Sequence, residues 1–415
     1  MQIHKRRCCE EIRGRSVSAL PYKRKSVFER GIRFVLAPLA ITVLSLSAGC
    51  QSPLDDTANA SKSVDIKPPP SQVQEAFGTK GAEITLMLPK GASGVREGRY
   101  RDFHDGAQLA VGELGGEQVF VKIVDDTGAP GEAAKLAEAA KARGSVALVG
   151  LFPAAELASI SAVPADKRPT VFDLGRGTAS GANVYGLASD ETDSAIAGVR
   201  YAIATGRKKV VILAPASFST AEEQRITAAI TNDKATVTGV VRYGGDEAAI
   251  KAAVASNAGP ISAADAALVL GGTTAPAVVV GAIKATGKTP ATMTFVGTSG
   301  WPGSVYSGPA ADQTVIALTD QESLKLISGR YQSRFKRPLA LDAAYAYDAV
   351  ATVAGITRLK GPDGLKPDIL ANKAGFRGVT GVFGWNKGGT IDRKLKIYRV
   401  DQGKLVPAVN TPPTL

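Results

Sequence analysis

Short apolar runs recur along the chain from Ile84 to Val400, and each one stops at a glycine, a proline or a polar residue. Runs of this length that are rich in Val, Ile and Leu predict buried β-strands. The expected strands are 84–89, 119–124, 146–149, 169–172, 209–213, 237–240, 267–270, 294–296 and 395–400. Segments with apolar residues at helical spacing alternate with them, and the expected helices are 99–114, 132–143, one ending near 163, 193–205, 221–231, 275–285 and 342–359.

This alternation of strands and helices predicts an α/β fold with parallel sheets that are covered by helices on both faces. So many strands are too many for one ordinary sheet, so we expect two lobes. The stretch 146–178 is the most informative part, because it predicts a strand, a glycine turn, a helix, a second strand and a second glycine turn. Ligands of open α/β sheets bind outside the carboxyl ends of strands, so these two turns predict half of a small-molecule site.

The net charge of the whole chain overstates the charge of the predicted folded domain. The chain of 415 residues has 50 Lys and Arg against 38 Asp and Glu, a formal net charge of +12. Ten of the basic and three of the acidic residues lie in 1–49, which leaves 40 against 35 for the rest. An excess this small on a large domain gives no reason to expect nucleic acid as a partner.

The basic excess belongs mainly to a predicted targeting segment. Arg30 and Arg33 precede an apolar run, 34–46, which is followed by Ser-Ala-Gly-Cys at 47–50. This order is typical of a cleaved signal peptide over 1–49, although a single uncleaved membrane anchor is the alternative. The last four residues resemble the lipobox of bacterial lipoproteins, which implies lipidation of Cys50. The basic stretch before the apolar run is long, so we also expect a start codon downstream of Met1.

The residues after Cys50 predict a tether. Residues 50–81 are polar and proline-containing and lack apolar periodicity, which is typical of a flexible linker. Cys8 and Cys9 lie in the leader, so Cys50 is the one cysteine of the mature chain and no disulfide is expected within it. By the lipoprotein resemblance, Gln51 in place of aspartate favours the outer membrane, and the domain is expected in the periplasm.

Several segments of the chain resemble the type I periplasmic solute-binding proteins, in the branch that binds leucine, isoleucine and valine. The terminal block 376–390, Phe-Arg-Gly-Val-Thr-Gly-Val-Phe followed by Gly-Gly-Thr, carries the most specific likeness. The other matching segments are 88–89, Gly98, 106–110, 124–126, 149–150 and 344–349. The resemblance covers about residues 82–408.

The resemblance implies two Rossmann-like lobes joined by three crossovers, with the ligand between them. Lobe one is then expected at 82–187 and 312–376, lobe two at 190–308 and 379–408, and a tail at 409–415. The hinges are expected near 187–190, 308–312 and 376–379, since closure of such a fold is a hinge motion.

The resemblance also implies where a ligand would lie in lobe one. In the family, backbone N–H groups and hydroxyls of the first-lobe turns hold an amino-acid carboxylate, and a helix N-terminus favours an anion there. Here the first turn offers Phe152, Ala154 and Ala155, so the usual hydroxyls are missing. Arg176 and Thr178 on the second turn are candidates to replace them, because a guanidinium binds a carboxylate with two hydrogen bonds. The alternative for Arg176 is a solvated loop residue.

The candidates in lobe two are Phe218, Thr273, Ser299 and Trp301. Phe218 can supply the aromatic side chain that the family usually has after the corresponding strand. Ser299 stands where many members have a carboxylate for the ligand's ammonium group. Because a buried ammonium without a charge partner is costly, a standard α-amino acid is doubtful as the ligand. Trp301 either stacks on a ligand or belongs to the core.

Other chemistries find little support in the sequence. His104 is the one histidine after the leader, it lies on a predicted helix, and no nucleophile motif accompanies it, so we expect a solvated side chain and no enzyme. The pair Asp125 and Asp126 follows a strand and precedes Thr-Gly, which favours a turn cap over a metal site. No cofactor or metal is expected.

Two functions remain open. The first is a lipid-anchored solute-binding protein that passes a small polar molecule, such as an amino acid, to an ABC transporter permease. The second is an outer-membrane lipoprotein adaptor that activates penicillin-binding proteins, and thus peptidoglycan synthesis, through protein contacts. The missing hydroxyls, the missing carboxylate and Gln51 favour the second, and the terminal block favours the first.

Overall fold

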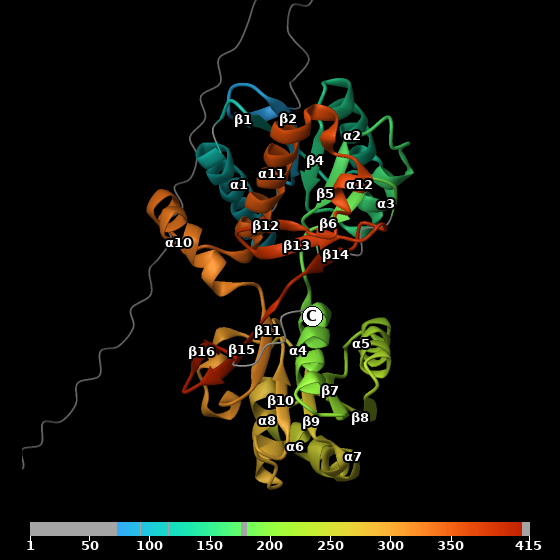
Figure 1. Ribbon diagram of the computed structural model, residues 1–415, viewed down its shortest axis with the longest axis vertical. Helices are drawn as coiled ribbons and strands as arrows, with labels where there is room; N and C mark the ends of the chain where they lie inside the picture. Colours follow the sequence, from blue (N-terminus) through green and yellow to red (C-terminus); the bar gives the residue numbers. More distant parts are fainter. Residues whose placement is uncertain (1–72, 92, 115, 176–180, 409–415) are drawn as a thin grey trace, which may run out of the picture. The chain divides into compact units, whose positions relative to one another are not determined.

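The computed structural model describes residues 73–91, 93–114, 116–175 and 181–408 (Figure 1). The predicted signal peptide, Cys50 and most of the tether lie outside the described residues, as do Arg176, Thr178 and the tail. In the described ranges, no helix has both the length and the apolar character that a membrane span requires.

The first lobe is built on a sheet with the strand order β1-β3-β2-β4-β5-β6. All neighbouring pairs are parallel except β1 and β3. The strand bounds are β1 (Val73–Phe77), β2 (Ala82–Leu88), β3 (Val119–Asp125), β4 (Ala147–Gly150), β5 (Thr170–Asp173) and β6 (Val184–Gly186). The prediction of a tether up to residue 81 is therefore wrong at its end, because β1 pairs with β3 and closes one edge of the sheet.

Alternate residues of these strands enter opposite layers, as the two-residue period of a strand requires. Ile84 and Leu86 of β2 belong to the core under α1 and α11, whereas Met87 belongs to the core under α2 and α3. The helices of this lobe are α1 (Val95–Leu114), α2 (Glu132–Ala142), α3 (Ala154–Ala162), α10 (Gln321–Phe335), α11 (Leu341–Lys360) and the short α12 (Pro367–Leu370), with a 3-10 turn at Pro362–Gly364. Helices α1 and α11 touch so closely at Gly106 that an added Cβ would lie 2.1 Å from the Ala343 carbonyl oxygen.

The second lobe has a sheet with the order β16-β15-β11-β10-β9-β7-β8, in which β15 and β16 are the antiparallel members. Its strands are β7 (Lys209–Pro215), β8 (Thr236–Tyr243), β9 (Ala266–Val269), β10 (Thr294–Gly297), β11 (Val315–Leu318), β15 (Lys396–Asp401) and β16 (Lys404–Pro407). Its helices are α4 (Glu191–Ala204), α5 (Thr220–Asn232), α6 (Glu247–Ser256), α7 (Ala258–Ala263), α8 (Ala275–Ala285) and α9 (Gly303–Tyr306), with a 3-10 turn at Pro309–Ala311. One face packs on α4 and α5 and the other on α6 to α8.

A third, smaller sheet joins β12 (Phe376–Gly378), β13 (Gly381–Trp385) and β14 (Ile391–Arg393). It belongs to the core of lobe one, because Trp385 lies 5.7 Å from the ring of Phe172 and 5.5 Å from that of Tyr185. The indole N–H of Trp385 also donates to the Gly186 carbonyl at 2.6 Å. The terminal block of the sequence, drawn in red in Figure 1, therefore completes lobe one before the chain enters β15.

Two of the three crossovers between the lobes lie at positions other than those expected from the sequence. The first lies between β6 and α4, at 187–190 as expected. Strand β11 pairs with β10, so the second lies at 319–320 and not at 308–312. The third lies at 394–395 and not at 376–379, because β12 to β14 pack on lobe one. The first and third are tied together by Arg393, which donates to the Leu187 carbonyl at 2.7 Å.

Candidate functional site

The first predicted turn follows β4 and leads into α3. Gly150 is required here, since an added Cβ would lie 2.5 Å from the ring of Phe152. Phe152 is 5% exposed and packs in the core under the turn, so its ring forms a floor rather than a ligand contact. Ala154 and Ala155 are exposed at the start of α3, which has no side-chain cap. Their backbone N–H groups are the donors that the start of a helix leaves without intrahelical partners.

A buried carboxylate that the sequence analysis did not single out binds the backbone N–H groups of this turn. Asp173 ends β5 and is completely buried. Its Oδ1 accepts hydrogen bonds from the backbone N–H of Gly175 at 2.8 Å and of Phe152 at 3.3 Å. Its Oδ2 is also buried and has no hydrogen-bond partner among the described residues. Two N–H donors of the predicted anion site are therefore already bound to a carboxylate of the chain itself.

Burial raises the pKa of Asp173 to about 6, although the two backbone N–H donors and the nearby Arg99 guanidinium act in the opposite direction. Arg99 itself is committed to Asp342, with 2.8 Å between Nε and Oδ2. Desolvation thus outweighs the favourable contacts of the charged form. At neutral pH the turn holds a largely ionised carboxylate that is hydrogen-bonded on one oxygen.

Two of the predicted residues of lobe two lie at turns after their strands. Phe218 is partly buried against the layer that α4 and α5 cover. Arg242 donates to the Phe218 carbonyl at 3.2 Å, which fixes the backbone of this turn. Thr273 is exposed, and its hydroxyl accepts from the N–H of Ala275 at 3.2 Å in the first turn of α8.

The turn after β10 separates the other two candidates. Ser299 is exposed, and its N–H donates to the Ser194 hydroxyl at 2.9 Å. Trp301 is 3% exposed, and its indole N–H donates to the Val269 carbonyl at 2.9 Å. Of the two alternatives for Trp301, the core position is therefore the one that the structure has, and stacking on a ligand is wrong for this conformation.

Lobe two also contains a carboxylate at its strand ends, which the sequence analysis considered missing. Glu191 begins α4 and is partly exposed. Its Oε1 accepts from the Gly271 N–H at 2.6 Å and from the Thr298 hydroxyl at 2.7 Å, so it spans the ends of β9 and β10. Acidic residues are common in the first helical turn, and Asp190 and Asp193 form a capping box there. No local pattern distinguishes Glu191 from such neighbours.

The tyrosines around Glu191 show how enclosed this corner is. Burial is the main cause that raises the pKa of Tyr306 to about 12, and the Glu191 charge adds to it. The Tyr306 hydroxyl donates to the Thr298 carbonyl at 3.1 Å. Burial and Glu191 likewise raise the pKa of Tyr243. These neutral phenols leave Glu191 as the charged group at the ends of β9 and β10.

The other sequence candidates have structural roles. His104 is not solvated as expected, because its ring bonds Asp105 at 2.9 Å and Glu75 of β1 at 3.0 Å. The hydrogen bond to Asp105 is the main cause that raises the pKa of His104. Asp125 accepts from the Lys90 N–H at 2.7 Å and Asp126 from the Gly128 N–H at 3.0 Å, which confirms the turn-cap interpretation. Over the described ranges, no group of His, Cys, Asp and Glu could hold a metal ion.

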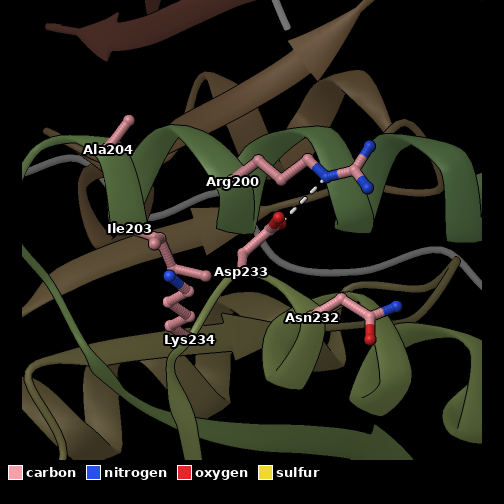
Figure 2. A pocket seen from close by; sticks show the side chains of 6 residues that line it. All are labelled: Arg200, Ile203, Ala204, Asn232, Asp233 and Lys234. Carbon is pink, nitrogen blue, oxygen red and sulfur yellow. Dashed lines mark hydrogen bonds and ion pairs between the residues drawn. The ribbon is translucent and has the colours of Figure 1, made fainter.

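Hollows elsewhere on the chain do not involve the predicted residues. Figure 2 shows one of about 470 Å³ between the end of α4 and the end of α5, where Arg200 pairs with Asp233 at 3.0 Å and Lys234 lies beside them. A second, of about 360 Å³, lies between α11 and β12, and a third, of about 620 Å³, lies between α6 and α8. The predicted site is thus a set of turns at strand ends and coincides with none of these hollows.

Comparison with solved structures gives the same fold. A protein from Rhodospirillum rubrum, described as a branched-chain amino acid ABC transporter, superposes with a TM-score of 0.66 at 16% identity, covering 79% of this chain and 100% of its own. The substrate-binding protein LivJ from Streptococcus pneumoniae, in complex with isoleucine, has a TM-score of 0.53 at 20% identity, with 79% and 98% covered. A solute-binding protein from R. palustris, in complex with benzoate, has a TM-score of 0.51 at 18% identity, with 79% and 95% covered.

Sequence comparison decides the family. No curated protein matches the chain. The family model described as "Periplasmic binding protein" matches residues 91–404, which is most of the chain and nearly all of both lobes. With its two α/β lobes and its turns at strand ends, the chain belongs to the periplasmic binding protein family.

Proposed function

We propose that this protein is the lipid-anchored, extracytoplasmic solute-binding component of an ABC transporter for amino acids or related small polar molecules. The family match over 91–404 is the observation that carries the proposal. The turns at the strand ends of both lobes support it, because ligands of such sheets bind there. The structural neighbours include proteins solved with isoleucine, leucine and benzoate, which are small molecules of this kind.

Membership in the family implies a location outside the cytoplasm. We further propose that Cys50 carries the lipid, with cleavage before it, and that Gln51 directs the protein to the outer membrane where the cell has one. Metabolic labelling with a fatty-acid analogue, followed by membrane fractionation, tests both points. Cys50→Ser is expected to abolish labelling, and labelling that persists in this variant would contradict the anchor.

The direct test of solute binding is a thermal-shift screen of the purified protein without its predicted signal peptide and Cys50, residues 51–415, against amino acids, amides, aromatic acids, amines and short peptides. A ligand that binds the native state raises the melting temperature by mass action. Calorimetry on each positive compound then gives the affinity. No shift across the whole panel, with a protein that unfolds cooperatively, would contradict the receptor.

The second candidate function is the adaptor that activates peptidoglycan synthases. Ala154 and Ala155, in place of hydroxyl side chains, are the observation that favours it. Purified synthase captured by the domain, together with faster glycan polymerisation or cross-linking in its presence, would support this function. For both candidates we expect no turnover of any substrate by the protein alone.

A further inference from the structure

In each lobe a carboxylate occupies the turns at the strand ends. In lobe one Asp173 lies between the ends of β4 and β5 and accepts from both turns. In lobe two Glu191 lies between the ends of β9 and β10 and accepts from Gly271 and Thr298. Neither carboxylate has an ion-pair partner within the described part of the chain, since the neighbouring Arg99 pairs with Asp342 and Arg225 with Asp193.

Each of the two carboxylates has one oxygen without a hydrogen-bond partner among the described residues. Asp173 is fully buried, and its Oδ2 has no hydrogen-bond partner among the described residues. The backbone of Gly175 packs close to that oxygen, since a Cβ added to this glycine would lie 3.1 Å from it. A buried acceptor without a donor is costly, so a donor that reaches it gains more than it would at the surface.

We infer that Asp173 and Glu191 together make this site select ligands that carry an amine or amide and no carboxylate. The inference rests on the proposed function and assigns the class of ligand for the same site. In lobe one Asp173 accepts from the N–H of Phe152, which stands two residues before Ala154 at the start of α3. A ligand carboxylate at this helix start would lie beside a buried like charge, an arrangement that costs several kcal/mol.

Lobe two adds the attractive part of the selection. Glu191 binds the protein through Oε1, and the hydrogen bonds of the described residues do not engage Oε2. An ammonium group at the ends of β9 and β10 would meet this oxygen, and the residues that follow these strands include the exposed Thr273 and Ser299. Charge-assisted hydrogen bonds of this kind are about twice as strong as neutral ones. The sequence has no carboxylate at position 299 to pair with a ligand's ammonium group. In this proposal Glu191, at the start of α4, supplies that carboxylate instead.

The test uses probes that differ in one group only. Leucine, leucinamide, isopentylamine and 4-methylpentanoate, with the matching sets for phenylalanine and glutamine, are titrated by calorimetry into the purified 51–415 protein at pH 7.5. We expect the amide or the amine of at least one set to bind at least about tenfold more tightly than the amino acid, and the acid not to bind. Equal or tighter binding of the amino acid would overturn the inference while leaving the receptor function intact.

Two variants separate selection from folding. Asp173→Asn keeps an oxygen for the Gly175 and Phe152 N–H groups but removes the charge, so the preference for amide over amino acid is expected to fall by about tenfold. Glu191→Gln is expected to weaken amine binding by a similar factor. Glu83→Gln is the matched control, because Glu83 is a buried carboxylate at the opposite end of β2, paired with Lys122 at 2.7 Å.

The control is expected to leave the preference unchanged even if it lowers stability. An unchanged preference in Asp173→Asn, with cooperative unfolding retained, would overturn the role of Asp173. If none of the probes and none of the wider panel binds the native domain, the proposed function fails, and the ligand class falls with it. These outcomes are distinct, since the first is a change in a ratio and the second is a lack of any heat of binding.

Discussion

The two lobes finish their central strands with the same arrangement but bury it to different depths. In lobe one the carboxylate of Asp173 is fully buried, and in lobe two that of Glu191 is partly exposed. Each accepts from a backbone N–H of the neighbouring strand-end turn. The same hydrogen-bonding arrangement is therefore closed to solvent in lobe one and partly accessible to it in lobe two.

Each lobe also has a buried tryptophan in the core beneath its strand-end turns. Trp385 donates its indole N–H to the Gly186 carbonyl in lobe one, and Trp301 donates to the Val269 carbonyl in lobe two. Both rings are almost fully buried. These two tryptophans therefore belong to the cores of the lobes beneath the strand-end turns.

The largest effect is expected from Trp301→Ala. Removal of a buried indole from the core of lobe two should lower the free energy of unfolding by about 3–5 kcal/mol. Chemical denaturation measures it. Trp301→Phe keeps most of the apolar area but leaves the Val269 carbonyl without its donor, so a smaller loss is expected. A full loss of ligand binding with unchanged stability would mean instead that the ring caps the ligand.

The next effect is a dependence of stability on pH that comes from Asp173. Burial raises its native pKa to about 6 from an ordinary 3.8, so the native state binds the proton more tightly than the unfolded state does. Stability from this group is therefore full below about pH 3.8 and is lost as the pH rises through about 6, by about 2–3 kcal/mol in total.

Comparison with Asp173→Asn isolates this effect, because other titrating groups cancel in the difference. The free energy of unfolding of the unmodified domain should fall relative to that of Asp173→Asn between pH 4 and pH 7. Arg99 is the described cation that acts on Asp173, so Arg99→Met should enlarge the fall. Parallel curves for the unmodified domain and Asp173→Asn would show that the Asp173 pKa is not raised.

Glu191→Ala is expected to cost about 1–3 kcal/mol, since it leaves the Gly271 N–H and the Thr298 hydroxyl without their acceptor. Glu191→Gln keeps an oxygen at the same place and should cost less. Denaturation of both variants at pH 7.5 measures the difference. If the two variants lose equal stability, the charge and not the hydrogen bonding holds the turns of lobe two.

The smallest effect is expected at the surface of the same turns. Thr273→Ala removes the hydroxyl that accepts from the Ala275 N–H at the start of α8, which should cost about 0.5–1 kcal/mol. Thr273→Ser keeps the hydroxyl and is the matched control. Thermal unfolding resolves the two, and an equal melting temperature for both would mean that water replaces the hydroxyl.

The periodicity of the sequence predicted most of the elements because the strands are buried on both faces and the helices on one. The runs at 84–89 and 146–149 match β2 and β4, and the helix predicted at 342–359 matches α11. Gly150 was predicted as a turn glycine and lies at the end of β4, whereas the close approach of Gly106 to α11 is seen only in the structure. Local pattern carries such information because burial imposes a period on the chain.

The lobe boundaries could not be predicted in this way. Strand β11 joins the sheet of lobe two through β10 and the distant β15, and local pattern does not show these partners. Within the described residues, strands β12 to β14 pair only with one another, and the packing of Trp385 on Phe172 and Tyr185 assigns them to lobe one. The edge strand β1 was missed because a short polar-flanked strand gains its stability from β3. Pairing is a tertiary event, so only the three-dimensional structure assigned these segments to lobes.

By itself, then, the sequence determined an α/β chain of two lobes with its turns at strand ends, and the ligand-binding role of those turns stays a prediction. Only the tertiary structure decided which groups occupy those loops. Asp173 looked like the end of a strand and Glu191 like part of a helix cap, and both occupy strand-end turns because folding brought distant N–H groups onto their oxygens. The charge of a site depends on such long-range contacts, and no local pattern records them.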